Sequence, residues 1–135
     1  MSDEARTIFS ENILGTIATT NEDSSPWSTP VHVFTDNEAV YWFSHGDKQH
    51  SLNIERDPRV SLTLFSPNLS RAPKGIYING TVTKLDDEST TTAKQLMMAK
   101  IGNITPYFEK ATGYKLLIGQ LNSSKSTSNC WYFYS

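Results

Sequence analysis

Short β-strand patterns separated by turn residues constrain the fold of this chain more than any other feature of its sequence. Each pattern is rich in β-branched and aromatic residues or alternates apolar with polar ones, and turn-forming residues lie between them. The predicted strands cover residues 14–20, 27–35, 39–44, 59–65, 75–85, 114–121 and 130–134. Asp36 and Asn37 both tolerate positive φ, so they predict a tight hairpin between the second and third strands. Because a closed sheet has no exposed edges, this pattern favours a small antiparallel barrel.

Two strand segments and the aromatic residues add detail to this prediction. Residues 39–44 form a nearly continuous apolar run, which predicts a strand covered on both faces. Gly80, inside the strand 75–85, indicates a bulge or a close approach of another backbone. The chain has more aromatic residues than are needed to fill one small barrel, and several of them look exposed. This suggests a subunit interface. These residues are Trp27, Trp42, Trp131, Tyr132 and Tyr134.

Three segments are predicted to be helical. Residues 47–56 have Asp47 as the expected N-cap and end before Asp57-Pro58. Residues 86–101 begin with acidic side chains and end at Gly102. Residues 105–110 begin with a threonine and a proline, the usual order of a cap and a first helical residue. With few helices among many strands, the sequence predicts a mainly β fold, a β-barrel with a few helices, in a single domain over residues 1–135. The apolar face expected for the second helix consists of Ala93, Leu96, Met97 and Ile101.

The composition excludes several classes of function. Of the 135 residues, 37% are hydrophobic and 19% are charged, and the net charge of −2 does not suit a nucleic-acid surface. No apolar run approaches the roughly 20 residues that span a bilayer, and the first residues lack the order of a secretory signal. We therefore expect a cytoplasmic protein with no nucleic-acid or membrane partner. The single cysteine, Cys130, rules out an internal disulfide, and the three histidines do not have metal-ligand spacing, so no metal site is expected.

The predicted strand–turn–helix around residues 41–53 is the first candidate site. The N-terminus of a helix presents unpaired N–H groups and the positive end of a dipole, so it suits an anion such as phosphate. Ser44 and Ser51 would add hydroxyl donors there, and Lys48 and His50 would add charge or hydrogen bonds. The alternative is a solvated helix start with ordinary polar residues.

The second candidate site is the segment Ser28 to His32. Pro30 removes one backbone donor, so this part of the strand should be an edge, a bulge or a stretch that faces a ligand. A simple edge strand is the alternative.

Taken in order, these motifs resemble the pyridoxamine 5′-phosphate oxidase-like, FMN-binding split β-barrel family. The likeness covers residues 14–85. It consists of Trp27-Ser-Thr-Pro-Val31, the Asp36-Asn37 hairpin, Tyr41-Trp-Phe-Ser44, His50-Ser-x-Asn-Ile54 and Asp57-Pro-Arg-Val60. The resemblance implies a homodimer of split barrels with two FMN molecules in the interface.

The resemblance also implies which residues touch the cofactor. The strand residues Ser28, Thr29, Pro30, Val31 and His32 would run beside the isoalloxazine, largely through backbone groups. The strand end and helix start would hold the phosphate, through Phe43, Ser44, Lys48, Gln49, His50 and Ser51. His50 stands where many relatives carry a lysine, so Lys48 is expected to supply the missing charge. Asn53 is expected to be a structural hydrogen-bonding residue.

We therefore expect an FMN-dependent oxidoreductase that moves electrons from a reduced nicotinamide-type donor to a small organic acceptor. The flavin would carry the redox chemistry, and no catalytic side chain is identified, although His32 and Tyr41 are candidates. The true oxidases carry basic residues near the C-terminus, whereas residues 129–135 contain none, so oxidation of pyridoxamine phosphate itself is not expected. One alternative is a non-catalytic flavin or heme binder or sensor that uses the same groove of the dimer. Another is a barrel without a cofactor that acts as an interaction module.

Overall fold

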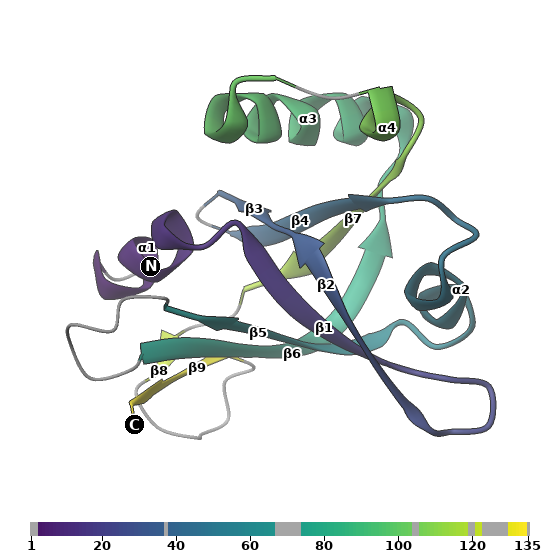
Figure 1. Cartoon of the computed structure of the whole chain (residues 1–135), viewed down its shortest axis with the longest axis horizontal. Helices are drawn as coiled ribbons and strands as arrows, with labels where there is room; N and C mark the ends of the chain where they lie inside the picture. The colour runs from purple at the N-terminus through teal and green to yellow at the C-terminus, as the bar shows by residue number, and fades with distance from the viewer. Residues whose placement is uncertain are drawn as a thin grey trace.

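A curled antiparallel sheet with a helix at each end forms the body of the protein in the computed structural model (Figure 1). The structure describes residues 3–36, 38–66, 74–103, 106–118, 121–122 and 130–134. The strands are β1 (Leu14–Thr20), β2 (Pro26–His32), β3 (Phe34–Thr35), β4 (Ala39–Ser44), β5 (Arg59–Phe65), β6 (Lys74–Lys84), β7 (Thr112–Leu117), β8 (Leu121–Asn122) and β9 (Cys130–Tyr134). The helices are α1 (Asp3–Glu11), α2 (Gln49–Arg56), α3 (Asp87–Ile101) and α4 (Pro106–Glu109).

The strand order is β2-β1-β5-β6-β7-β4-β3, and every neighbouring pair on this path is antiparallel. The two strands at the ends of this order, β2 and β3, follow each other in the chain and are separated only by Val33. The sheet therefore curls until its first and last strands meet, which is the geometry of a split barrel. The predicted mainly β barrel fold is confirmed.

The long strand β6 connects the two halves of the sheet. Its first residues pair with β9 through Lys74–Ile78, and its last residues pair with β7 through Val82–Lys84. Gly80 lies between these two stretches and pairs with Val60 of β5 in an unbroken register. The expected bulge at Gly80 is therefore absent, and the glycine instead sits where β6 passes from one partner strand to the other.

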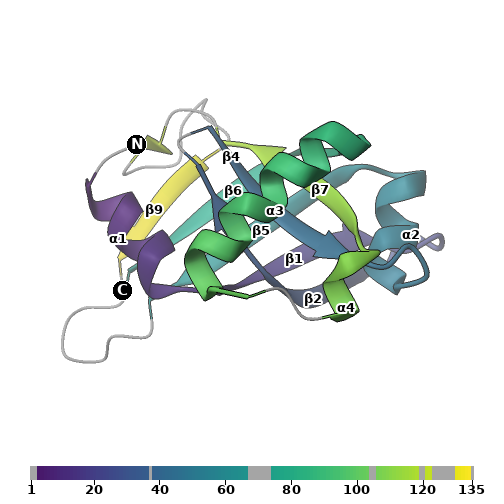
Figure 2. The ribbon, with the colours of Figure 1, turned by 90° about the horizontal axis from the view of Figure 1, so that it is seen from above.

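Two apolar clusters lie on opposite faces of β4. Val40 and Trp42 point into the barrel, where the main core also takes Ile8 and Phe9 from α1 and Ile54 from α2. Phe34 and Phe43 point the other way and pack beneath Ala93 and Met97 of α3. Figure 2 shows α3 crossing over this part of the sheet. The prediction that residues 39–44 are covered on both faces is confirmed.

Several sequence-based details need correction. Trp42 is completely buried and stacks on Tyr114 with ring centroids 5.9 Å apart, so it does not contribute to an exposed aromatic surface. Trp27 is 42% exposed as expected, whereas the side chains of residues 131–134 lie outside the described part of the structure. Ile101 is 39% exposed and lies outside the buried face of α3. The strand expected over 27–35 divides at Val33 because His32 ends β2 before β3 turns toward α3.

The helix ends show which local signals were reliable. Asp86 caps α3 by accepting a hydrogen bond from the Ser89 amide at 2.7 Å, and Gly102 ends the helix in the left-handed conformation with φ of 78°. The acidic start and the end at Gly102 agree with the sequence prediction, whereas the helix begins one residue later than predicted because Asp86 is its cap. The sequence analysis did not predict α1, although Ala5, Ile8 and Phe9 follow helical spacing and are all buried.

Candidate functional site

The start of α2 lies after a turn rather than directly at Asp47. The Lys48 amide donates to the His45 carbonyl at 3.2 Å, which places residues 45–48 in a turn and delays the helix to Gln49. The N-cap is Lys48, and no side chain caps the helix. The prediction that Asp47 is the N-cap is therefore wrong. The first turn contains no acidic residue, so the positive end of the helix dipole is not neutralised within that turn.

Ser44 and His50 form a buried pair behind this helix start. The Ser44 hydroxyl and the His50 Nε2 are 2.8 Å apart, and the two residues are only 4% and 7% exposed. Burial lowers the pKa of His50 below its ordinary value, and the nearby charge of Lys48 lowers this pKa further. His50 is thus mainly neutral near pH 7. It orients Ser44 and contributes no positive charge of its own.

Ser51 and Lys48 complete the helix start. The Ser51 hydroxyl is buried and has no hydrogen-bond partner among the described residues, which is unusual for a buried polar group. Lys48 is exposed. The positive groups available at this end of α2 are therefore the backbone amides of its first turn and the Lys48 ammonium.

A network of amide side chains ties α2 to the turn between β1 and β2. Asn53 is 2% exposed, and its Nδ2 donates to the Thr19 hydroxyl at 3.0 Å and to the Asn21 Oδ1 at 2.9 Å. Gln49 donates to the Asn53 Oδ1 at 2.9 Å. Asn53 is a structural residue, as expected, and the exposed Gln49 hydrogen-bonds to this network.

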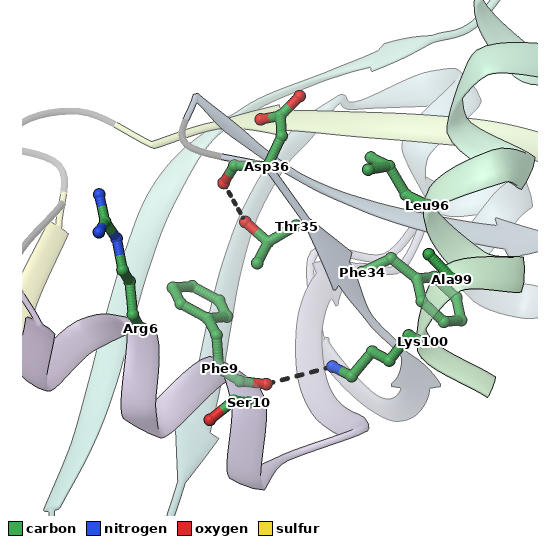
Figure 3. Close-up of a pocket in the computed structure, with 9 residues that line it drawn as sticks. All are labelled: Arg6, Phe9, Ser10, Phe34, Thr35, Asp36, Leu96, Ala99 and Lys100. Atoms are coloured by element: carbon green, nitrogen blue, oxygen red, sulfur yellow. Dashed lines mark hydrogen bonds between the residues drawn. The ribbon is translucent and has the colours of Figure 1, made fainter.

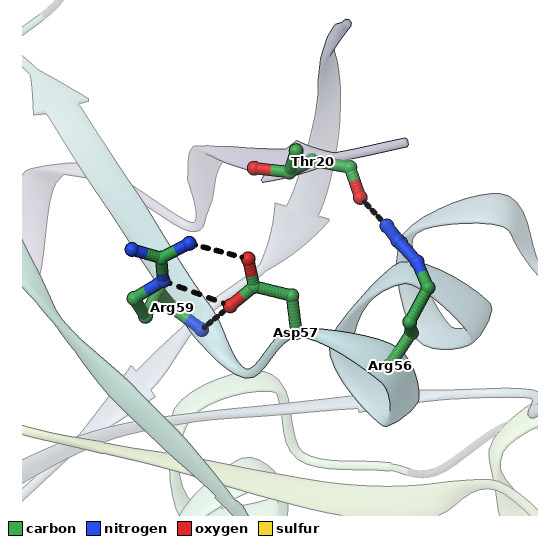
Figure 4. A network of polar contacts seen from close by, with 4 residues as sticks. All are labelled: Thr20, Arg56, Asp57 and Arg59. Carbon is green, nitrogen blue, oxygen red and sulfur yellow. Dashed lines mark hydrogen bonds and ion pairs between the residues drawn. The ribbon is translucent and has the colours of Figure 1, made fainter. Parts of the chain in front are cut away.

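The C-terminal end of α2 is tied to the same turn and to the next strand (Figure 4). Arg56 donates to the Thr20 carbonyl. Asp57 accepts two hydrogen bonds from the Arg59 guanidinium, at 3.0 and 2.8 Å, and a third from the Arg59 amide. These bonds lower the pKa of Asp57 to about 2. Helix α2 is thus held at both ends, so its N-terminus has a fixed position.

The segment Ser28 to His32 belongs to β2, which pairs with β1 alone among the described strands. Ser28, Pro30 and His32 are exposed, Thr29 is half-buried, and Val31 lies in the barrel core. Val31 can therefore offer only its backbone to a ligand. Phe43 can likewise offer only its backbone, because its side chain is buried beneath α3, on the face of β4 that points away from the barrel interior.

A chain of four aromatic and imidazole rings links β2 to the turn before α2, a feature that sequence reasoning missed. His32 meets Phe108 edge-on at 6.1 Å, Phe108 meets Tyr107 at 4.9 Å, and Tyr107 meets His45 at 4.5 Å. The His45 Nε2 also donates to the Tyr107 carbonyl at 2.7 Å. These contacts fix α4 beside both candidate segments. Their only sequence signal was the Tyr-Phe pair that follows Pro106.

The other candidates are placed elsewhere or excluded. Tyr41 donates to Asp36 at 3.0 Å, and burial together with this bond raises the pKa of Tyr41 to about 12, so its proton is firmly held. Among the described residues no group of three or more His, Cys, Asp or Glu side chains could hold a metal ion. None of the described helices is long and apolar enough to cross a bilayer.

Solved structures with the same fold include cofactor-binding proteins. A heme binding protein from Mycobacterium smegmatis is 21% identical with a TM-score of 0.75, over 84% of this chain but only 49% of its own length. A conserved hypothetical protein from Mycobacterium tuberculosis is 18% identical with a TM-score of 0.76, over 99% of this chain and 85% of that one. An FAD-binding protein from Mesorhizobium loti is 17% identical with a TM-score of 0.61, over 86% and 96%.

Comparison at the sequence level gives the family. No curated protein matches the sequence. The family model of pyridoxamine 5′-phosphate oxidase, by contrast, matches residues 1–120, which is most of the chain and includes both candidate segments. The chain therefore belongs to the pyridoxamine 5′-phosphate oxidase family.

Proposed function

We propose that this protein binds a flavin, with FMN as the preferred form, and works as an oxidoreductase that passes electrons from a reduced nicotinamide-type donor to a small organic acceptor. The observation that carries this proposal is the uncapped, acid-free first turn of α2 in a member of this family. Among flavins, FMN combines a redox ring with a terminal phosphate, and the phosphate is the group that such a helix start favours.

The residues around this helix start fit a phosphate. Backbone amides of the first turn supply donors, and Lys48 supplies a mobile positive charge beside them. The buried Ser51 hydroxyl lacks a partner among the described residues, which is expected where a bound group or an ordered water completes the hydrogen bonding. The Ser44–His50 pair stiffens the strand end next to the helix.

The exposed side of β2 is the part of the chain that we propose lies along the flavin ring. Ser28, Pro30 and His32 are exposed on this strand, and its second edge has no partner strand among those described. A bound flavin would supply hydride and single-electron transfer, so the side chains here need only position the ring and limit the access of water.

We further propose that the protein acts as a homodimer. By register and burial, the outer face of β1, β5 and β6 carries uncharged residues through the middle of the sheet. They are Thr16, Ala18, Ser61, Thr63, Phe65, Tyr77 and Asn79. Phe65 is 47% and Tyr77 39% exposed. A face whose middle carries no charge and has exposed aromatic rings suits a second copy of the chain, because interface cores are depleted of charged residues.

Heme binding is a second candidate function. The Mycobacterium smegmatis relative of the same fold is described as a heme binding protein. In this chain the exposed imidazole of His32 on β2 has no hydrogen-bond partner among the described residues, so it could act as an iron ligand. His45 is less suitable because its Nε2 is committed to Tyr107.

The absorption spectrum of the purified protein, followed by anaerobic addition of NADH or NADPH, tests these functions. The proposal predicts a flavin spectrum that is bleached by one of the two donors and restored by an acceptor. A Soret band would support heme binding instead. A flavin spectrum that neither donor bleaches would indicate a non-catalytic carrier, and a colourless protein that binds neither group would refute both cofactor proposals.

A further inference from the structure

A cavity lies between α1, β3 and α3, apart from the start of α2 (Figure 3). Its volume is about 510 Å³, within the usual range for small-molecule sites. Leu96 and Ala99 give it apolar walls, the almost fully buried rings of Phe9 and Phe34 lie at its floor, and four polar or charged residues surround them besides Arg6. The residues that line it do not include any residue of α2 or β2.

Both hydroxyl groups in the wall already donate to the backbone. The Ser10 hydroxyl donates to the Thr7 carbonyl at 2.9 Å. The Thr35 hydroxyl is shared between the carbonyls of Asp36 and Ala39, both at 2.7 Å. Neither hydroxyl has a free proton with which to select a ligand.

The carboxylate in the wall, that of Asp36, accepts hydrogen bonds on both oxygens. One carboxylate oxygen of Asp36 accepts from the amides of Glu38 and Ala39 at 2.8 and 2.9 Å. The other oxygen accepts from the Tyr41 hydroxyl at 3.0 Å. Asp36 thus serves the hairpin between β3 and β4, and its negative charge is outweighed in the wall by the two cations Arg6 and Lys100.

The Lys100 ammonium also uses its hydrogen-bond donors within the protein. Its ammonium donates to the carbonyls of Phe9, Asn12 and Val33 at 3.1, 2.8 and 3.2 Å. An ammonium has three protons, so none remains for a ligand. Lys100 therefore joins α3 to the end of α1 and to the bend between β2 and β3.

Among the described residues that line the cavity, Arg6 is the side chain that still has donors to offer. Among the described residues its ion pair is with Asp3, at 4.0 Å, and the Asp3 side chain is fully exposed. Such a pair is weak, since water screens both charges. A guanidinium presents five N–H donors in a planar fork that matches a carboxylate.

From this accounting we propose that the cavity between α1, β3 and α3 is a binding site for a small monocarboxylic acid with an aliphatic or single-ring apolar body. The apolar body lies against Phe9, Phe34 and Leu96, and the carboxylate pairs with Arg6. A neutral analogue gains only the apolar contacts. A cationic analogue meets a wall in which the two positive groups, Arg6 and Lys100, outweigh the one negative group, Asp36, and is disfavoured.

Isothermal titration of the full-length protein with octanoate, 1-octanol and octylammonium tests this site, with each probe kept below its aggregation concentration. We expect octanoate to bind at one site per chain and about threefold more tightly than octanol, because Arg6 is partly exposed and water weakens its pair with the carboxylate. Octylammonium should bind more weakly than octanol. Failure of octanoate to saturate, or equal affinity for octanoate and octanol, would overturn the proposal.

Two variants separate the charge from the cavity. Arg6→Gln should remove the preference for octanoate over octanol, whereas the matched control Lys110→Gln, at an exposed cation outside the cavity, should keep it. Ala99→Phe adds bulk at an exposed position of α3 and should weaken octanoate and octanol alike. Undiminished octanoate binding by Ala99→Phe would place the binding elsewhere, and an unchanged preference in Arg6→Gln would exclude Arg6 as its anchor.

Discussion

Replacing Asn53 should cost the protein much more stability than its polar side chain suggests. Asn53→Ala removes two donated hydrogen bonds, to Thr19 and Asn21, and one accepted from Gln49. Thr19 is 3% exposed, so its hydroxyl cannot readily recover a partner from water. An unpaired buried group costs about 1–3 kcal/mol and each further bond about 1 kcal/mol, so we expect a loss of about 3 kcal/mol.

Urea unfolding followed by circular dichroism measures this change, with Gln49→Ala as the control. Gln49→Ala takes one donor from the Asn53 Oδ1 but leaves the bonds of Asn53 to Thr19 and Asn21, so it should cost about 1 kcal/mol, well below the loss in Asn53→Ala. A double-mutant cycle with Thr19→Val should give a coupling of about 1 kcal/mol between residues 19 and 53. A loss in Asn53→Ala as small as that of Gln49→Ala, or a coupling of zero, would refute this account of how α2 is anchored.

Three further predictions concern single groups. The pKa of His50 is lowered in the folded state, so below its ordinary pKa of about 6.5 the unfolded chain binds more protons than the folded one. The free energy of unfolding of the wild type should therefore fall between pH 7 and 5 more steeply than that of His50→Asn, as measured by urea titrations in parallel. Lys100→Met should lower the free energy of unfolding by about 1–2 kcal/mol, as it frees three backbone carbonyls, and an effect equal to that of Lys110→Met would contradict this. Gly102→Ala should lower the free energy of unfolding by about 1 kcal/mol in thermal unfolding, because an alanine there has room for its Cβ but must adopt a positive φ. Gly46→Ala, where the Cβ also has room and φ is not positive, should be neutral.

The strands were predictable because the alternation of burial is written directly in the sequence. In β5, Val60, Leu62 and Leu64 are buried and the residues between them are not, as the pattern required. The curl of the sheet was harder to predict from the sequence. It depends on β2 and β3 being separate strands on either side of Val33, whereas in the sequence the two strands form a single extended pattern.

The local structure of the candidate site was predictable, but the contacts of its side chains were not. The turn and helix after β4 were predicted, whereas only the fold shows that His50 is buried against Ser44. Asp47 was expected to cap the helix by residue type alone, whereas the turn from His45 to Lys48 moves the helix start beyond it. The contacts of Tyr107 and Lys100 join residues distant in the chain, so no local pattern could have predicted them.

The measurement that tests the central claim most directly is the affinity of the flavin-free protein for FMN relative to riboflavin, by flavin fluorescence. The two ligands share the ring and differ in the phosphate, so the ratio isolates the helix start of α2. We expect FMN to bind at least about tenfold more tightly, and Lys48→Ala to reduce this ratio while the control Lys110→Ala preserves it. Equal affinities for FMN and riboflavin in the wild-type protein would contradict the account.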